Sequence, residues 1–288
     1  MNPASPLRTL LAIGRVAGLP TVWSNCLAGW WLGGGGNYWK LPFLFLGTSA
    51  LYTGGAFLND AFDEEFDRQR RAERPIPTGR ISASRVWRLG FGQLALGIVL
   101  LFFCGKVAAV AAVLLALSIL LYDWAHRLFI ASPWLMGACR FWVYAIAGAT
   151  GMGGLNGFVV FCGAALAIYV VGLGCVARKE NGRRAVPLWP LPLLAAPIML
   201  ALLMNAGEYS HPAGWVSLVL GLWVARCVRP VIFQDETSPG WIVANLLAGI
   251  MFVDWLSVAP QLPPATGAIV FLALFGLAKW LQKSVPSA

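Results

Sequence analysis

Long apolar segments recur along the whole chain, and they constrain its fold more than any other feature. A helix that crosses a bilayer needs about 20 mostly apolar residues, because the hydrocarbon core is about 30 Å thick. Ten segments approach that length: 10–32, 41–60, 87–104, 107–122, 133–151, 156–177, 187–205, 213–228, 240–258 and 266–282. Of the 288 residues, 59% are hydrophobic and only 11% are charged, against about 25% charged in an average soluble domain. We therefore predict an all-α, polytopic transmembrane helical bundle that forms a single integral-membrane domain over residues 1–288.

The basic residues lie almost entirely in every second loop of this arrangement. Cytoplasmic loops of membrane proteins carry an excess of Lys and Arg. With a cytoplasmic N-terminus, 17 of the 21 basic residues fall in cytoplasmic loops, Lys40 and Lys106 fall in opposite loops, and Arg15 and Arg140 fall inside predicted spans. This distribution favours ten spans with both termini in the cytoplasm. Nine spans with one re-entrant segment are the alternative.

The net charge of +9 is compatible with a nucleic-acid surface or with loops at a membrane. The basic residues sit in short blocks between apolar segments and form no continuous face, so we expect membrane lipids as partners and no nucleic acid. The six cysteines include no C-x-x-C pair, which leaves a metal cluster or a redox motif without support.

The acidic residues concentrate where the second predicted span ends. Asn59, Asp63 and Asp67 are spaced four residues apart, so on a helix they share one face. Asp60 and Glu64 form a neighbouring stripe. Carboxylates beside an apolar helix are costly to desolvate unless a cation pairs with them. From the residues alone, two interpretations stay open: a site for a hard cation such as Mg²⁺, or a solvated helix end paired with the arginines that follow it.

A longer pattern contains these residues and resembles a known family. The segment 59–67 reads NDxxDxxxD, and 74–82 reads RPIPTGRIS. Together they resemble the first signature of the UbiA superfamily of intramembrane prenyltransferases. The resemblance implies an all-helical bundle, usually of nine spans. Together with the ten apolar segments, it leads us to expect nine to ten helices around a central lipid-accessible cavity. It also implies that an isoprenoid diphosphate binds through Mg²⁺ at two aspartate-rich motifs, and that the prenyl group passes to a hydrophobic or aromatic acceptor.

The resemblance assigns roles to particular residues. It implies that Asn59, Asp63 and Asp67 hold Mg²⁺ with Asp60 in support, and that Asp63 and Asp67 are the catalytic carboxylates. Arg74 of the signature is expected to contact the diphosphate or the acceptor. The same is expected of Tyr122 and Arg127. Together with His126, they occupy positions where the family often has a tyrosine followed by a Lys-Arg pair.

The second aspartate-rich motif of the family is not intact in this sequence. The family usually has DxxxD near residues 176–182, where this chain has Arg178, Lys179 and Glu180. One interpretation is that Arg178 and Lys179 bind the diphosphate directly and Glu180 contributes the remaining carboxylate. The other is that these cations anchor the loop at an anionic membrane surface.

Arg140 is the second departure, because it lies inside a predicted span where family members often have asparagine. An arginine at membrane depth normally faces a partner or a wet cavity. Arg140 could bind the diphosphate or a polar acceptor, or it could form a structural bridge to Asp254, the only acid in the ninth predicted span.

The sequence and its resemblance therefore predict Mg²⁺-dependent transfer of a prenyl group from an isoprenoid diphosphate to an aromatic or lipid-type acceptor within the membrane. Replacing Asp63 by alanine tests this prediction most directly. Two alternatives remain: a non-catalytic lipid carrier or assembly component with the same fold, and a membrane terpene cyclase. We expect the protein in a bacterial plasma (inner) membrane.

Overall fold

The computed structural model describes residues 6–177, 189–204, 210–233 and 238–285. Every regular element within these ranges is helical. The α-helices are α1 Pro6–Ile13, α2 Leu19–Leu32, α3 Leu41–Phe62, α4 Glu64–Arg70, α5 Ala83–Phe102, α6 Lys106–Ala125, α7 Ser132–Thr150, α8 Gly157–Ala177, α9 Ala196–Met204, α10 Ser210–Phe233, α11 Pro239–Ala248, α12 Ile250–Val258 and α13 Pro264–Ser284. Short 3₁₀ turns lie at Val16–Gly18, Tyr38–Lys40 and Leu191–Ala195.

Seven helical segments of the described chain are long and apolar enough to cross a membrane. They are Tyr38–Phe62, Ala83–Phe102, Lys106–Ala125, Gly157–Ala177, Pro212–Phe233, Gly240–Val258 and Pro264–Ser284. The prediction of an all-α integral membrane protein is confirmed, whereas nine to ten crossings remain a prediction. α7 has the length of a span but lower hydropathy, and Leu191–Met204 forms a shorter apolar helix.

The predicted span 10–32 is not one straight helix. α1 ends at Ile13, and Arg15 adopts a left-handed backbone conformation (φ 46°, ψ 42°) before the 3₁₀ turn and α2. Such a conformation costs a non-glycine residue about 1–2 kcal/mol. Gly18 follows because Tyr52 packs against it: a Cβ there would lie 2.0 Å from the tyrosine hydroxyl oxygen. The break places Arg15 beside the end of α3.

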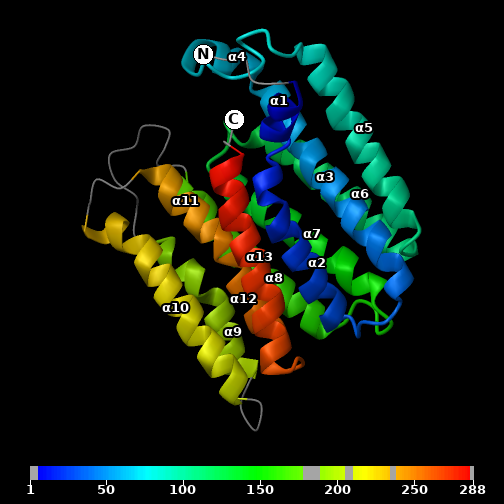
Figure 1. The fold of residues 1–288 in the computed structure, drawn as a ribbon, viewed down its shortest axis with the longest axis vertical. Coiled ribbons are helices and arrows are strands. Elements are labelled where there is room, and N and C mark those ends of the chain that lie inside the picture. Colours follow the sequence, from blue (N-terminus) through cyan, green and yellow to red (C-terminus); the bar gives the residue numbers. More distant parts are fainter. Residues whose placement is uncertain (1–5, 178–188, 205–209, 234–237, 286–288) are drawn as a thin grey trace.

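Two apolar clusters share the central helices α2 and α7. One cluster joins them to α3, α5 and α6, and the other joins them to α8 through α13. Small residues let α2 and α7 pack closely, since a Cβ on Gly33 would lie 2.2 Å from the carbonyl oxygen of Gly148. Close approach at small residues is typical of helix packing in membranes. Figure 1 shows α2, α7 and α8 in the interior of the bundle, with α5 on one flank and α10 on the other.

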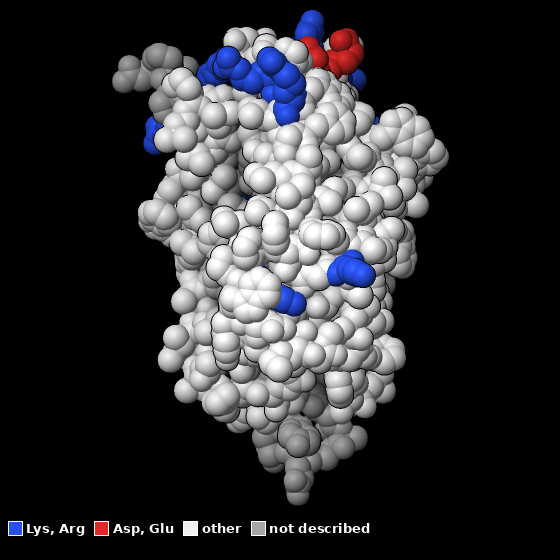
Figure 2. Space-filling model, turned by 90° about the vertical axis from the view of Figure 1, so that its right-hand side faces the viewer, with Lys and Arg blue, Asp and Glu red and all other residues white. Residues whose placement is uncertain are grey.

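Charged side chains are concentrated at one end of the molecule. Figure 2 shows Lys, Arg and acidic side chains at the upper end, above a wide surface with almost no charge. That surface includes the outward faces of α5 and α6, where large side chains such as Val99, Val110 and Leu117 are exposed. Such a face suits contact with lipid. α1 begins, α4 lies and α13 ends at the charged end (Figure 1).

Candidate functional site

The acidic segment at the junction of α3 and α4 is buried. Asp63 separates the two helices, but its backbone N–H still bonds to Asn59 (3.0 Å) and its carbonyl still accepts from Asp67 (2.8 Å), so the helical spacing continues. Asn59, Asp60, Asp63 and Asp67 are each at most 7% exposed. Glu64 and Glu65 instead face outward and bond to Arg68 and Gln69. The interpretation as a solvated helix end therefore fits the two glutamates and not this polar row.

Arginines that precede and follow the row in the chain form ion pairs with it. Arg74 Nη1 donates to Asp60 Oδ1 (3.0 Å) and lies 3.5 Å from Asp67 Oδ2. Arg15 Nη2 bonds to the carbonyl oxygen of the Asn59 side chain and lies 3.2 Å from Asp60 Oδ1. Arg74 is held there by a compact turn in which Thr78 donates to its backbone carbonyl through both N–H and Oγ1.

The segment after α6 supplies the partners of Asp63. Arg127 Nε donates to Asp63 Oδ1, and its guanidinium lies 3.4 Å from the centre of the Phe66 ring. His126 Nε2 lies 3.2 Å from the same oxygen, and Tyr122 stacks on the His126 ring. Burial by itself raises the pKa of Asp63, but the bonds from His126 and Arg127 outweigh it and hold that pKa well below the usual value. Asp63 is therefore ionised at neutral pH.

Asp67 has a different electrostatic environment. Burial raises the pKa of Asp67, and repulsion from Asp63 and Asp60 adds to this, while Arg74 and Arg127 offset only part of it. Among the described residues its Oδ1 atom is buried with no hydrogen-bond partner, and the nearest Arg127 nitrogen lies 4.0 Å away. One carboxylate of the row thus keeps a buried oxygen that accepts no hydrogen bond from these residues.

Asp123 of α6 contacts the row through Asn59. Its Oδ1 accepts a bond from Asn59 Nδ2 (3.1 Å), and its Oδ2 is buried without a hydrogen-bond partner in the part of the chain that the structure describes. His126 Nδ1 lies 2.9 Å from the Asp123 backbone carbonyl. Asp123, Arg15 and His126 were not among the site residues that sequence reasoning selected. A charge beside or inside a predicted span is the signal that could have found Arg15 and Asp123.

These side chains fit a hard divalent cation. Carboxylate and amide oxygens are the ligands that Mg²⁺ prefers, and Mg²⁺ usually takes one or two carboxylates and completes its shell with water and substrate phosphate. Asp67 and Asp123 each offer a buried oxygen that no described residue serves with a hydrogen-bond donor. Within the described residues, no three carboxylate, thiolate or imidazole side chains form a preformed metal cage. The arrangement therefore suits a metal that arrives with its phosphate ligand.

A second polar network lies deeper in the bundle. Arg140 of α7 donates to Thr21 Oγ1 (2.9 Å) and to Asn25 Oδ1 (2.9 Å). Asn25 in turn donates to Asp254 (2.8 Å), which also accepts bonds from the hydroxyls of Ser24 and Tyr144. The structural bridge between Arg140 and Asp254, one of the two interpretations left open, thus runs through the Asn25 amide rather than through a direct ion pair. The Arg140 guanidinium also lies over the Tyr52 ring at 5.8 Å.

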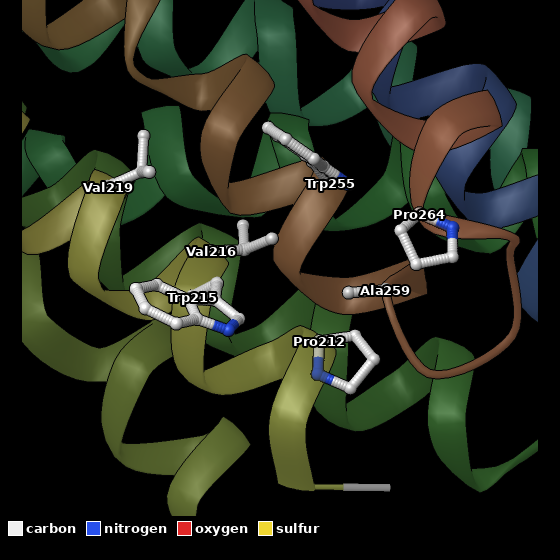
Figure 3. A pocket seen from close by; sticks show the side chains of 7 residues that line it. All are labelled: Pro212, Trp215, Val216, Val219, Trp255, Ala259 and Pro264. Carbon is white, nitrogen blue, oxygen red and sulfur yellow. The ribbon is translucent and has the colours of Figure 1, made fainter.

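An apolar pocket of about 280 Å³ lies at the opposite end of the bundle, where α12 ends and α10 and α13 begin (Figure 3). Trp215, Val216 and Val219 line it from α10, and Trp255 and Ala259 lie across from them. It contains almost no polar surface, so it offers no group for acid, base or phosphate chemistry.

A model of the UbiA prenyltransferase family matches residues 17–284. The chain belongs to this family. The family resemblance read from the first signature is therefore confirmed over most of the chain.

Individual relatives in the UbiA family align over parts of the chain. A protoheme IX farnesyltransferase of Alkalihalophilus pseudofirmus is 38% identical over 89 residues, which cover 30% of this chain and 28% of that protein. A 4-hydroxybenzoate octaprenyltransferase of Albidiferax ferrireducens is 37% identical over 31% of this chain and 34% of its own length. A digeranylgeranylglyceryl phosphate synthase of Methanopyrus kandleri is 26% identical over 63% of this chain and 71% of its own. The chain thus spans about a third or less of the first two relatives.

Solved structures of UbiA homologues have the same fold. The apo homologue from Aeropyrum pernix K1 superposes with a TM-score of 0.68 at 16% identity, covering 89% of this chain and 97% of that one. The homologue from Archaeoglobus fulgidus bound to GPP and Mg²⁺ gives a TM-score of 0.63 at 12% identity, covering 96% and 99%.

The structure brings together most of the residues expected at the site. Asn59, Asp60, Asp63, Asp67, Arg74 and Arg127 are linked by direct contacts, and Tyr122 reaches them through His126. Arg140 stands apart in the deeper network. Arg178, Lys179 and Glu180 lie outside the described residues.

Proposed function

We propose that this UbiA-family protein is a Mg²⁺-dependent prenyltransferase that moves a prenyl group from an isoprenoid diphosphate to an aromatic or lipid-type acceptor inside the membrane. One observation carries the proposal: buried carboxylates at the charged end of the bundle keep free oxygens while three arginines surround them. The names of the relatives agree, since each describes a prenyl-transferring or lipid-forming enzyme.

The charge balance of the site supports a requirement for a cation. Arg15, Arg74 and Arg127 already pair with the aspartates of the row. A strongly anionic diphosphate placed beside these carboxylates is repelled unless a divalent cation lies between them. Bound Mg²⁺ would supply Lewis-acid stabilisation of the departing diphosphate, with Asn59, Asp63 and Asp67 holding it and Asp60 in support.

The chain's own residues then have distinct tasks. Arg127 and His126 keep Asp63 ionised and fix its orientation. Arg74 and Arg15 lie beside the row, where they can also meet the negative charge that develops as the C1–O bond breaks and both electrons leave with the diphosphate. The acceptor forms its new bond to C1, and the proton that it loses passes to the released diphosphate or to water. Tyr122, which stacks on His126, is proposed to contact the diphosphate or the acceptor.

We assign Arg140 to the acceptor side of the reaction. On α3, Tyr52 precedes Asp60 by eight residues, which is about 12 Å of helix, and the Arg140 guanidinium lies over the Tyr52 ring. Arg140 is thus deeper than the carboxylate row, where a polar group of a membrane-embedded acceptor would need a partner. A central lipid-accessible cavity between the two networks, within nine to ten helices, is part of this proposal.

The charged end of the bundle is proposed to face the cytoplasm of a bacterial plasma membrane, with both termini on that side. The excess of basic residues in the loops of that side supports this orientation. In the same account, Arg178, Lys179 and Glu180, which follow α8 in the sequence, also bind the diphosphate.

The test incubates the purified protein with Mg²⁺ and labelled geranyl, farnesyl or geranylgeranyl diphosphate, with and without an aromatic acceptor or a lipid extract. Release of diphosphate with formation of a prenylated acceptor is expected, and Asp63→Ala should abolish it. Tight retention of the intact prenyl diphosphate without release would instead establish a lipid carrier, which the incomplete second motif favours. A cyclised hydrocarbon formed without acceptor would establish a terpene cyclase.

A further inference from the structure

Asp123 has a side-chain environment that a purely structural role does not explain. It is 4% exposed and lies on α6, 64 residues from Asn59, the residue that donates to its Oδ1 atom. Its Oδ2 atom has no hydrogen-bond partner among the described residues. Buried carboxylate oxygens normally accept hydrogen bonds or bind a cation, because desolvating them otherwise costs free energy.

The cations near Asp123 are engaged with other groups. Arg15 contacts Asn59 and Asp60, and Arg127 contacts Asp63. The Asn59 amide is oriented by its two partners, since its oxygen accepts from Arg15 while its nitrogen donates to Asp123. Asn59 therefore holds Asp123 in a fixed position with one oxygen left open.

We infer that Asp123 is a ligand of the metal and supplies the carboxylate that the second aspartate-rich motif of this chain lacks. The inference rests on the proposed function and deepens it. Near that second motif the sequence keeps one carboxylate, Glu180, among basic residues, whereas α6 brings a buried carboxylate directly against the first motif. Because Mg²⁺ needs only one or two protein carboxylates when phosphate oxygens complete its shell, Asp123 and a carboxylate of the row are sufficient together.

The test compares Asp123→Asn with Glu65→Gln as a matched control. Both variants remove one carboxylate charge. Asparagine preserves the shape of Asp123 and can still accept the bond from Asn59, while Glu65 is exposed and bonds only to Gln69 among the described contacts. Binding of Mn²⁺ is measured by electron paramagnetic resonance of the free ion, in the presence of a non-reacting prenyl thiolodiphosphate. We expect the Kd for Mn²⁺ to rise at least tenfold in Asp123→Asn and to stay unchanged in Glu65→Gln.

Two further arms keep the outcome decisive. If Asp123→Asn does not fold, as thermal unfolding would reveal, Asp123→Glu takes its place: it keeps the charge but displaces the oxygen, and weaker Mn²⁺ binding in a folded protein is expected. If a folded variant binds Mn²⁺ with the affinity of the wild-type protein, the inference is overturned. Asp123 would then have a structural role or be protonated. If the wild-type protein itself binds no Mn²⁺, the proposed function fails instead.

Discussion

Replacing Arg74 by alanine tests whether the loop after α4 is part of the site or only covers it. The side chain is 13% exposed and pairs with two buried carboxylates, Asp60 at 3.0 Å and Asp67 at 3.5 Å. Exposed ion pairs contribute about 0.2–1 kcal/mol, whereas removing one partner of a buried pair costs about 3–5 kcal/mol. Asp60 keeps Arg15 as a partner, so we expect Arg74→Ala to cost about 2–4 kcal/mol, between these two limits.

The matched control for this substitution is Arg68→Ala. Arg68 is 61% exposed and pairs with Glu64 one helical turn away, so its removal should cost no more than about 0.5 kcal/mol. Thermal unfolding of the purified, detergent-solubilised variants, without metal, measures both. Equal unfolding temperatures for the two variants would refute the reasoning, because the same charge change would then act independently of burial.

The pH dependence of Arg74→Ala provides a second readout of the same contact. Burial, with repulsion from the neighbouring aspartates, raises the pKa of Asp67, and Arg74 opposes that rise. Without Arg74 the pKa should rise further. Above the pKa that Asp67 has in the folded protein, its ionised carboxylate lowers the free energy of unfolding. Protonation of Asp67 removes this destabilisation as the pH falls. The destabilisation by Arg74→Ala should therefore shrink as the pH falls through the raised pKa of Asp67. A penalty that grew on acidification would contradict this assignment.

Five other substitutions, four of them compared in pairs, have defined outcomes. Asp63→Asn should lower the unfolding temperature more than Asp67→Asn, because the pKa of Asp63 is lowered and that of Asp67 is raised in the folded protein; the reverse order would show that their environments are misassigned. Gly33→Ala should destabilise by about 1–3 kcal/mol, since its Cβ would lie 2.2 Å from a backbone oxygen of α7, whereas Gly92→Ala meets nothing within 4 Å and should stabilise α5 by up to about 1 kcal/mol. Arg140→Gln should raise the KM for the acceptor in transfer assays while leaving Mn²⁺ and prenyl diphosphate binding unchanged; weakened binding of both would move Arg140 to the diphosphate site.

The membrane helices could be predicted because hydropathy and length act locally. The predicted segment 41–60 corresponds to α3 at Leu41–Phe62, and 156–177 to α8 at Gly157–Ala177. The break at Arg15 could not be predicted in this way. Its left-handed backbone is stabilised by contacts with Tyr52, Asn59 and Asp60, which lie about 40 residues away along the chain. Local apolar periodicity contains no information about such partners.

The candidate site could likewise be predicted only where the information is local in the sequence. The signature located Asn59, Asp63 and Asp67, because helical spacing alone puts them on one face. The partners that set their charge states come from other segments: Arg15 precedes the row by 44 residues or more, and Asp123 and Arg127 follow it by about 60. The packing of α6 against α3 brings Asp123 and Arg127 to the row, and the break between α1 and α2 brings Arg15 to it; one sequence does not determine that packing.

The most direct test of the account is the position of the metal in the complex with a prenyl thiolodiphosphate. Anomalous diffraction from Mn²⁺ in crystals of the wild-type protein locates the ion independently of activity. The account predicts an ion about 2.0–2.3 Å from a carboxylate oxygen of Asp63 or Asp67 and in contact with the diphosphate. A diphosphate bound to arginines alone at the charged end, with no ion at this carboxylate row, would contradict it.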